Sequence, residues 1–193
     1  ISLTSYMSKD APEYFAVEAD LRDIAIVASR YNSKLVDSLI GSVVETLISC
    51  GVSEDNIEVV RVPGANEIPY AASMLARTEE HDVIIALGVV IAGQTDHHTI
   101  IAESTGQALQ QVALNQEIPV INGIITVGSL EQAEARINGD YQRGVDFARA
   151  ALEMAQVGDS LEDRIFEGTF DFSDDDLETL RELDEFSEDD EDK

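Results

Sequence analysis

Short apolar runs alternate with segments of helical periodicity along most of this chain, and this alternation constrains the fold most strongly. The predicted strands cover residues 24–28, 57–62, 82–88 and 118–124. Helices are predicted over residues 34–50, 66–77, 98–115 and 140–155, with a further helix start at Ser129. Repeated strand–helix units give parallel strands joined by right-handed crossovers. The sequence therefore predicts an α/β protein, a three-layer α/β/α sandwich with a four-stranded parallel sheet.

A four-stranded sheet leaves two edge strands that need protection from unwanted pairing. Residues 14–17 are a candidate for an added strand, and the alternative is a strand from a neighbouring subunit. The predicted organisation is an N-terminal arm at residues 1–19, one α/β domain at residues 20–157 and an acidic tail at residues 158–193.

The acidic charge of the chain is concentrated towards its C-terminal end. The formal net charge is −27, and residues 159–193 contain 17 acidic and 3 basic residues. Such a surface argues against direct binding of nucleic acids and of anionic membranes. The tail is expected to be disordered, because repulsion outweighs its small apolar area. Two interpretations stay open, a solubilising tail or a short acidic-hydrophobic motif that folds on a basic partner.

Cysteine content and hydropathy indicate a chain of the cell interior. Cys50 is the single cysteine, so an intrachain disulfide is impossible, and a small buried side chain at a helix end is expected there. No apolar stretch reaches the roughly 18 residues that a membrane span needs. The first residues lack the pattern of a secretory signal. A cytoplasmic location is therefore expected.

Polar residues follow the predicted strands, and parallel strands place their carboxyl ends at one edge of the sheet, where ligands of open α/β sheets bind. This edge is predicted to gather an aromatic ring, a carboxylate, a glycine-hydroxyl turn and an imidazole, from residues 30–32, 62–67, 93–98 and 122–123. Each has a simpler interpretation. Tyr31 is equally consistent with an exposed loop aromatic, and Glu67 with an acid that complements a helix dipole. For Gly93 taken alone, a plain turn is the favoured interpretation.

The segment at residues 93–98 carries the clearest chemistry. The turn Gly93-Gln94-Thr95 opens onto a helix, where backbone N–H groups and the Thr95 hydroxyl form a site for an anion. His97 follows, and an imidazole suits proton transfer near neutral pH. His98 is expected to point elsewhere, and His81 is expected to be a remote surface residue. The chain has no metal-ligand spacing and no glycine-rich dinucleotide or P-loop pattern.

Five sequence blocks, in this order, resemble the lumazine synthase family, whose members make 6,7-dimethyl-8-ribityllumazine in riboflavin biosynthesis. The resemblance covers about residues 20–157. The blocks are Ser-Arg-Tyr-Asn at 29–32, Val-Pro-Gly-Ala-Asn-Glu-Ile-Pro at 62–69, Gly-Val-Val-Ile-Ala-Gly-Gln-Thr-Asp-His at 88–97, Pro-Val-Ile-Asn-Gly-Ile-Ile-Thr at 119–126 and Glu-Gln-Ala-Glu-Ala-Arg at 131–136. The second and third blocks together are specific.

The resemblance implies a flavodoxin-like fold and a transferase that needs no cofactor. It implies condensation of 5-amino-6-(D-ribitylamino)uracil with 3,4-dihydroxy-2-butanone 4-phosphate, with release of phosphate and water, the penultimate step of riboflavin biosynthesis. It also implies homopentamers, some of which form sixty-subunit icosahedral capsids, with each active site between two subunits.

The resemblance also implies roles for individual residues. His97 is the implied general acid and base. Tyr31 stacks on the pyrimidine, Glu67 accepts from a ribityl hydroxyl, and Arg136 of a neighbouring subunit clamps the phosphate. The remaining implied substrate-binding residues are Ala65 and Asn66 for the ribityl chain, Val89, Val90 and Ile91 for the pocket wall, Gln94 and Thr95 for the phosphate, and Asn122 over the pyrimidine.

The chain departs from the family pattern at a few positions. Ala92 stands where arginine is common, Asn66 and Asn122 stand where aromatic residues are common, and Ala135 replaces an acid before Arg136. These departures motivate an alternative hypothesis, a non-catalytic paralogue that forms a shell or binds flavin or lumazine, with an acidic partner-binding tail. The retention of Glu67, Thr95, His97 and Arg136 favours the enzyme.

Overall fold

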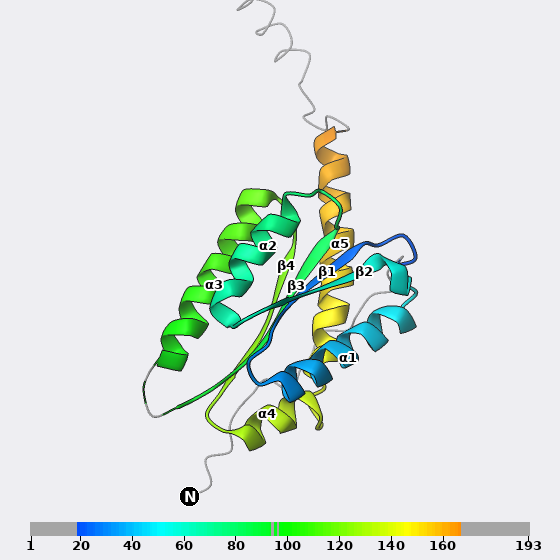
Figure 1. Cartoon of the computed structure of the whole chain (residues 1–193). Coiled ribbons are helices and arrows are strands. Elements are labelled where there is room, and N and C mark those ends of the chain that lie inside the picture. The colour runs from blue at the N-terminus through cyan, green and yellow to red at the C-terminus, as the bar shows by residue number, and fades with distance from the viewer. Residues whose placement is uncertain (1–18, 94, 96, 167–193) are drawn as a thin grey trace, which may run out of the picture. The chain divides into compact units, whose positions relative to one another are not determined.

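A four-stranded, all-parallel sheet forms the centre of the structure, a computed structural model that describes residues 19–93, 95 and 97–166. Its strands are β1 (Ile24–Ser29), β2 (Ile57–Val62), β3 (Val83–Ile91) and β4 (Val120–Val127). They lie in the order β2-β1-β3-β4, so the chain winds outward from β1 in both directions (Figure 1). This topology confirms the predicted parallel sheet and the flavodoxin-like class.

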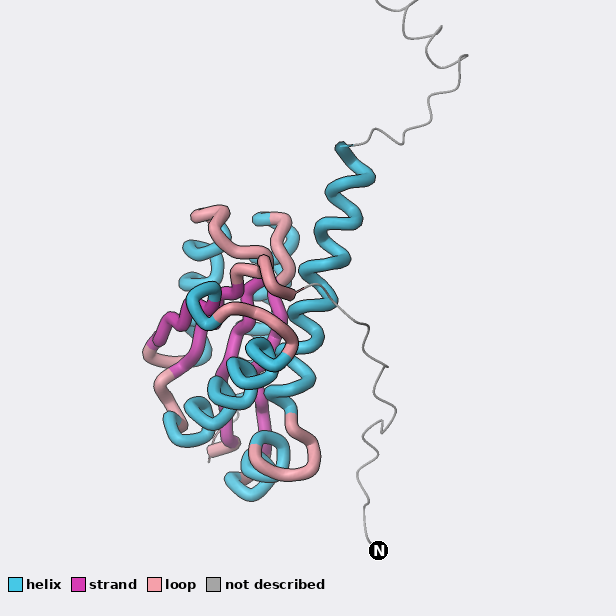
Figure 2. The backbone as a smooth tube through the Cα atoms, turned by 90° about the vertical axis from the view of Figure 1, so that its right-hand side faces the viewer, coloured by secondary structure: helices cyan, strands magenta, loops and turns pink. Residues whose placement is uncertain are grey.

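Helices cover both faces of the sheet, and Figure 2 shows the strands lying between them. The helices are α1 (Ser33–Ser49), α2 (Ile68–Ala76), α3 (His97–Gln116), α4 (Leu130–Ile137) and α5 (Arg143–Phe166), with short 3-10 turns η1 (Glu54–Asn56) and η2 (Ala65–Glu67). Helices α2 and α3 share one apolar core, whereas α1, α4 and the part of α5 before Gly158 share the other. The three-layer sandwich is therefore confirmed.

The side chains of β1 point alternately to the two faces of the sheet, which explains why there are two apolar cores. Ile24, Ile26 and Ala28 face the layer of α1, α4 and α5, whereas Ala25 and Val27 face the layer of α2 and α3. Successive side chains of a strand point to opposite faces, so a central strand must be apolar at every position. Full burial of an aliphatic side chain contributes about 1.5–3 kcal/mol. The central strands thus stabilise both layers at once.

The ends of β3 and β4 differ from the prediction. Strand β3 continues to Ile91 and β4 to Val127, because these residues pair with each other in parallel register. The predicted end of the fourth strand at residue 124 was wrong, since β4 continues past it to Val127. Apart from the last helix, the remaining predicted boundaries agree with the structure more closely, and Gly51 ends α1 with a φ of 110°.

The last helix also differs from the prediction. Helix α5 begins at Arg143 and runs to Phe166, beyond the predicted end at residue 155, so the first residues of the predicted tail are helical. Residues 1–18 of the N-terminal arm and residues 167–193 of the tail lie outside the described residues. Cys50 is exposed at the end of α1, which corrects the expectation of burial. No helix in the described part of the chain is long and apolar enough to cross a membrane.

Gly123 allows β4 to pack closely against its neighbours, and replacing it with Ala is expected to destabilise the fold by about 1–3 kcal/mol. A Cβ there would lie 2.7 Å from Leu87 Cδ2, 2.9 Å from the Ala86 carbonyl oxygen and 3.0 Å from Phe147 Cδ2. Gly41→Ala in α1 is the matched control, because no atom lies within 4 Å of its added Cβ. That change is expected to stabilise the helix by up to about 1 kcal/mol. Parallel urea unfolding curves measure both effects, and equal stability of Gly123→Ala and wild type would refute the close packing.

Candidate functional site

A cavity of about 510 Å³ opens at the carboxyl edge of the sheet, on the side of α2 and α3. Four segments line it: the end of β1 with the turn that follows, the turn after β2, the end of β3, and the first turns of α3. The strand order places β1 between β2 and β3, so three consecutive strand ends meet there. The parallel topology therefore creates the cavity that the sequence predicted for this edge.

The turn after β1 forms the first wall, with Tyr31 and Asn32. Asn32 has a left-handed backbone (φ 54°), and its Nδ2 donates to the Val89 carbonyl oxygen at 2.8 Å. This hydrogen bond connects the turn to β3 across the cavity. The Arg30 N–H donates to the Val62 carbonyl oxygen at 2.8 Å and connects the same turn to β2. Tyr31, 73% exposed, thus stands at the rim on a turn held from both sides.

The turn after β2 forms the second wall with Gly64, Ala65, Asn66 and Glu67. Gly64 has an extended backbone that any residue adopts (φ −141°), so its small size is what matters here. A Cβ at Gly64 would lie 2.9 Å from Glu67 Oε2 and 3.4 Å from Tyr31 Cδ2. The aromatic ring and the carboxylate therefore both lie against the bare backbone of Gly64.

The end of β3 and one face of α3 complete the cavity. Val89, Val90 and Ile91 come from the strand, and the helix contributes His97, Ile100, Ile101 and Ser104. The helical positions are spaced i, i+3, i+4 and i+7, which places them on one face of α3. His97 is exposed at the first turn of that face.

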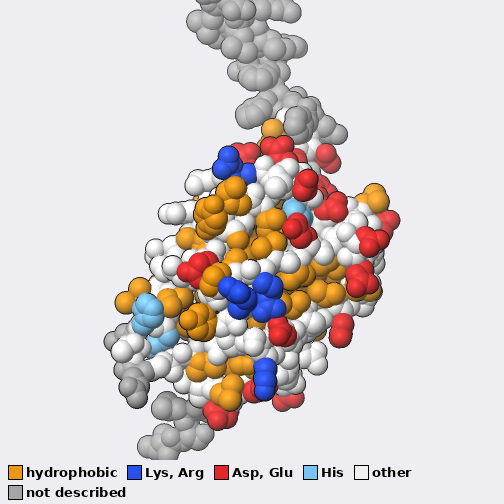
Figure 3. All heavy atoms as spheres, in the orientation of Figure 1, with side chains coloured by type: hydrophobic (Ala, Val, Ile, Leu, Met, Phe, Trp, Pro, Cys, Tyr) orange, Lys and Arg blue, Asp and Glu red, His pale blue; other side chains and the backbone are white. Residues whose placement is uncertain are grey.

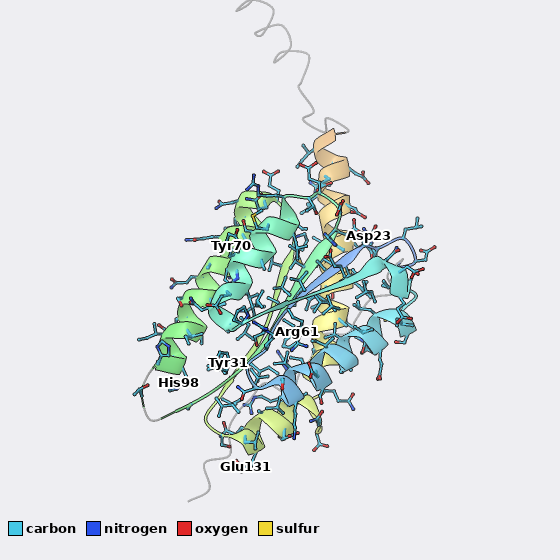
Figure 4. The ribbon with its side chains drawn as sticks, in the orientation of Figure 1. Asp23, Tyr31, Arg61, Tyr70, His98 and Glu131 are labelled. Carbon is cyan, nitrogen blue, oxygen red and sulfur yellow. The ribbon has the colours of Figure 1, made fainter. Side chains whose placement is uncertain are left out.

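His98 occupies a different position from His97. Its Nδ1 lies 3.1 Å from the Thr95 carbonyl oxygen, a hydrogen bond that closes the turn before α3. Figure 4 shows His98 at the start of α3, at the same end of the sheet as Tyr31 and Arg61. His98 does not line the cavity, as the sequence predicted.

The structure brings together most of the predicted site residues. Those that line the cavity are Tyr31, Ala65, Asn66, Glu67, Val89, Val90, Ile91 and His97. Thr95 is exposed before α3 and is not among the lining residues, and Gln94 lies outside the described residues. Asn122 and Arg136 are also not among the lining residues.

Asn122 lies inside β4, not at its carboxyl end, which corrects its predicted placement. Its Oδ1 accepts from the Ile124 N–H at 3.1 Å, and its Nδ2 would lie 3.4 Å from a Cβ at Gly106 of α3. The error follows from the predicted strand end at residue 124, since β4 begins at Val120 and continues to Val127. Asn122 therefore lies on the α3 side of β4 and is not among the residues that line the cavity of its own chain.

Arg136 lies on α4, which packs in the layer opposite the cavity. Its Nη1 donates to the Gln132 carbonyl oxygen at 3.1 Å, and its guanidinium lies 5.9 Å from the centroid of the Tyr141 ring. The helix begins as predicted, because the Ser129 hydroxyl accepts from the Gln132 N–H. The backbone N–H of Glu131 and the Ser129 hydroxyl lower the pKa of the Glu131 carboxyl, which favours the charged acid at the helix N-terminus.

Sequence reasoning assigned no role to six lining residues, which are Ser29, Asn32, Gly64, Ile100, Ile101 and Ser104. The three α3 residues were predictable from their helical spacing relative to His97. Ser29 and Gly64 carry no comparable signal, since a serine before a turn and a glycine after proline have many simpler explanations.

The charge lining the cavity is sparse. Glu67 and His97 provide a carboxylate and an imidazole, and none of the described lining residues is Lys or Arg. Arg61 lies close to the cavity, but its guanidinium already forms an ion pair with Asp37 (2.6 Å) and donates to the Ser29 carbonyl oxygen (3.0 Å). The cavity of a single chain thus offers an aromatic surface, a carboxylate, an imidazole and hydroxyls, but no cationic partner for an anion.

His81 precedes β3 and lies away from the cavity, as predicted, but it is not a surface side chain. Only 6% of its side chain is exposed, and its Nε2 lies 3.0 Å from Glu58 Oε2 on β2. The pair connects β2 to the start of β3 and has no part in the cavity.

Comparison with known proteins identifies relatives over most of the chain. The family model described as 6,7-dimethyl-8-ribityllumazine synthase matches residues 22–158. A protein of that name from Xanthomonas oryzae pv. oryzae is 42% identical over 145 residues, which cover 72% of this chain and 94% of the relative. Others of that name come from Xylella fastidiosa (40% over 149 residues, 75% and 97%) and Stenotrophomonas maltophilia (41% over 150 residues, 75% and 97%).

Proposed function

The chain belongs to the 6,7-dimethyl-8-ribityllumazine synthase family, and on this premise we propose that the cavity at the carboxyl edge of its sheet is the substrate site. The protein is a transferase of riboflavin biosynthesis that condenses 5-amino-6-(D-ribitylamino)uracil with 3,4-dihydroxy-2-butanone 4-phosphate. The observation that carries the placement is the convergence of Tyr31, Glu67 and His97 on one cavity.

The lining residues divide into parts that match the two halves of the pyrimidine substrate. The Tyr31 ring provides a flat surface for stacking on the uracil, and Val89, Val90 and Ile91 provide an apolar wall with backbone groups beside it. Glu67 and Asn66 lie on the second wall, where a carboxylate and an amide suit the hydroxyls of a ribityl chain.

His97 is the proposed proton carrier. The amine of the pyrimidine adds to the ketone of the second substrate, water leaves as the imine forms, and phosphate is released. An imidazole donates or accepts protons near neutral pH, which contributes about 10²–10⁴-fold to the rate. Holding the two substrates together contributes further.

The phosphate requires positive charge, and none of the described residues that line the cavity is Lys or Arg. We assign it to Gln94 and Thr95 before α3 together with Arg136 of a neighbouring subunit. The position of Arg136 supports this assignment, because α4 packs in the layer opposite the cavity and Arg136 is not among the residues that line the cavity of its own chain.

A site that needs Arg136 of a neighbouring subunit requires the subunits to assemble. The proposed assembly is a homopentamer, with a sixty-subunit capsid as the larger form. Strand β2 is an edge strand in the described sheet, with Val59 40% exposed. Figure 3 shows hydrophobic side chains across the face that includes this edge, among few Lys and Arg side chains. The unpaired backbone groups of an edge strand favour pairing with another chain.

The alternative of a non-catalytic paralogue is not favoured. Ala92, one of its motivating departures, has a backbone N–H that donates to the Val127 carbonyl oxygen at 2.8 Å, and it does not line the cavity. Asn122 likewise does not line the cavity of its own chain. A basic partner for the acidic tail and a cytoplasmic location stay predictions.

Mixing both substrates with purified protein is expected to produce lumazine absorbance well above the uncatalysed background. Light scattering of the same sample is expected to give a particle of several subunits, not a 21.0 kDa monomer. Lumazine formation no faster than the uncatalysed background would refute the substrate-site proposal. An enzyme that is active as a monomer would refute the assignment of Arg136 to a neighbouring subunit.

A further inference from the structure

Ser29 contributes a buried hydroxyl to the cavity that the roles above do not use. It is the last residue of β1, lines the cavity and is 1% exposed. Its Oγ has no hydrogen-bond partner among the described residues. Buried hydroxyls are almost always hydrogen-bonded, because an unmade bond costs the full desolvation of the group. An unpaired hydroxyl in a ligand cavity therefore indicates a missing polar partner.

The surroundings of this hydroxyl suit a flat, uncharged group. Gly88 lies beside it on β3, and a Cβ there would lie 3.4 Å from Ser29 Oγ and 3.6 Å from side-chain atoms of both Ile68 and Ile124. These distances place the Ser29 hydroxyl among apolar side chains, next to the bare backbone of Gly88. The Arg61 guanidinium donates a hydrogen bond to the Ser29 carbonyl oxygen, which holds the Ser29 backbone in place.

The chemistry of this space favours an uncharged heteroaromatic ring over a phosphate. No described lining residue is Lys or Arg, and the phosphate is assigned above to Gln94, Thr95 and Arg136 of a neighbouring subunit. A serine hydroxyl both donates and accepts, which matches the ring carbonyls and ring N–H groups of a uracil. Resting on the proposed function, we propose that the Ser29 hydroxyl hydrogen-bonds a polar edge of the uracil ring at the floor of the cavity.

Thr105 of α3 provides a matched control inside the same layer. It is also 1% exposed, and its Oγ1 also lacks a partner among the described residues, but it does not line the cavity. Ser29→Ala and Thr105→Val each remove one buried, unpaired hydroxyl with little change of volume. The two variants therefore separate the loss of a ligand contact from the loss of a buried hydroxyl as such.

Steady-state kinetics of wild type and both variants test the proposal. Ser29→Ala is expected to raise KM for the pyrimidine substrate about 3- to 10-fold, the usual effect of one hydrogen bond, with KM for the butanone phosphate unchanged. Thr105→Val is expected to leave both KM values unchanged. Thermal melting is expected to show neither variant less stable than wild type, because each loses an unpaired polar group.

Three results would overturn the role of Ser29. The first is an unchanged KM for the pyrimidine in Ser29→Ala. The second is a rise in KM for the butanone phosphate as large as the rise for the pyrimidine, or larger. The third is a clear loss of stability in Ser29→Ala, which would show that the hydroxyl has a hydrogen-bond partner within the protein. Calorimetric titration with the pyrimidine substrate alone makes the test independent of turnover. If wild type made no lumazine, the proposed function would fail, while weaker binding of the pyrimidine by Ser29→Ala would still support this contact.

Discussion

Replacing His97 with Gln is expected to lower kcat about 100-fold or more, without abolishing turnover. Glutamine keeps a polar side chain of similar reach at the first turn of α3, but it cannot take up and return a proton. The residual rate reflects positioning of two substrates in one cavity, which does not depend on the imidazole. Stopped-flow or steady-state measurement of lumazine formation at saturating substrates gives kcat directly.

His98→Gln is the matched control for His97→Gln. The two histidines are neighbours at the start of α3, but His98 contacts the Thr95 carbonyl oxygen and does not line the cavity. Its replacement is expected to change kcat less than about twofold, which corresponds to well under 1 kcal/mol. A His97→Gln enzyme as fast as wild type would show that another group carries the proton, and equal losses in both variants would indicate damage to the turn instead.

The element order and the position of the site were predictable from local sequence features. Continuous apolar runs identify the buried parallel strands, and the residues after β1, β2 and β3 had to meet at one edge of the sheet. Tyr31, Glu67 and His97 converge for this reason. Even the start of α4 followed from the serine that caps it.

Features that depend on packing between elements were not predictable in the same way. Gly123 packs inside β4, where Leu87 and Phe147 leave no room for a side chain. The predicted strand ended too early, at residue 124, and this placed Asn122 near the carboxyl end of the strand. The Ser29 hydroxyl likewise has no hydrogen-bond partner among the described residues because of the side chains that pack around it in space. Residue spacing along the sequence does not predict such an arrangement.

Arg136→Ala is expected to raise KM for 3,4-dihydroxy-2-butanone 4-phosphate about 10- to 100-fold, the usual effect of losing a charged hydrogen bond. KM for the pyrimidine is expected to stay close to the wild-type value, because the uracil and ribityl contacts lie elsewhere in the cavity. Arg149→Ala on the exposed side of α5 controls for the loss of one positive charge from a very acidic chain, and it is expected to leave both KM values unchanged.

A mixing experiment decides which subunit supplies the arginine. His97→Gln and Arg136→Ala subunits, each weakly active alone, are unfolded together and reassembled. Where an Arg136→Ala chain provides the cavity and a His97→Gln chain provides the arginine, a complete site forms. In a ring with head-to-tail interfaces and random mixing, about one quarter of the sites are complete. Activity approaching that fraction of wild type is therefore expected. A mixture that only averages its two components would place Arg136 in its own subunit's site or outside the site, against the separation of α4 from the cavity by the sheet.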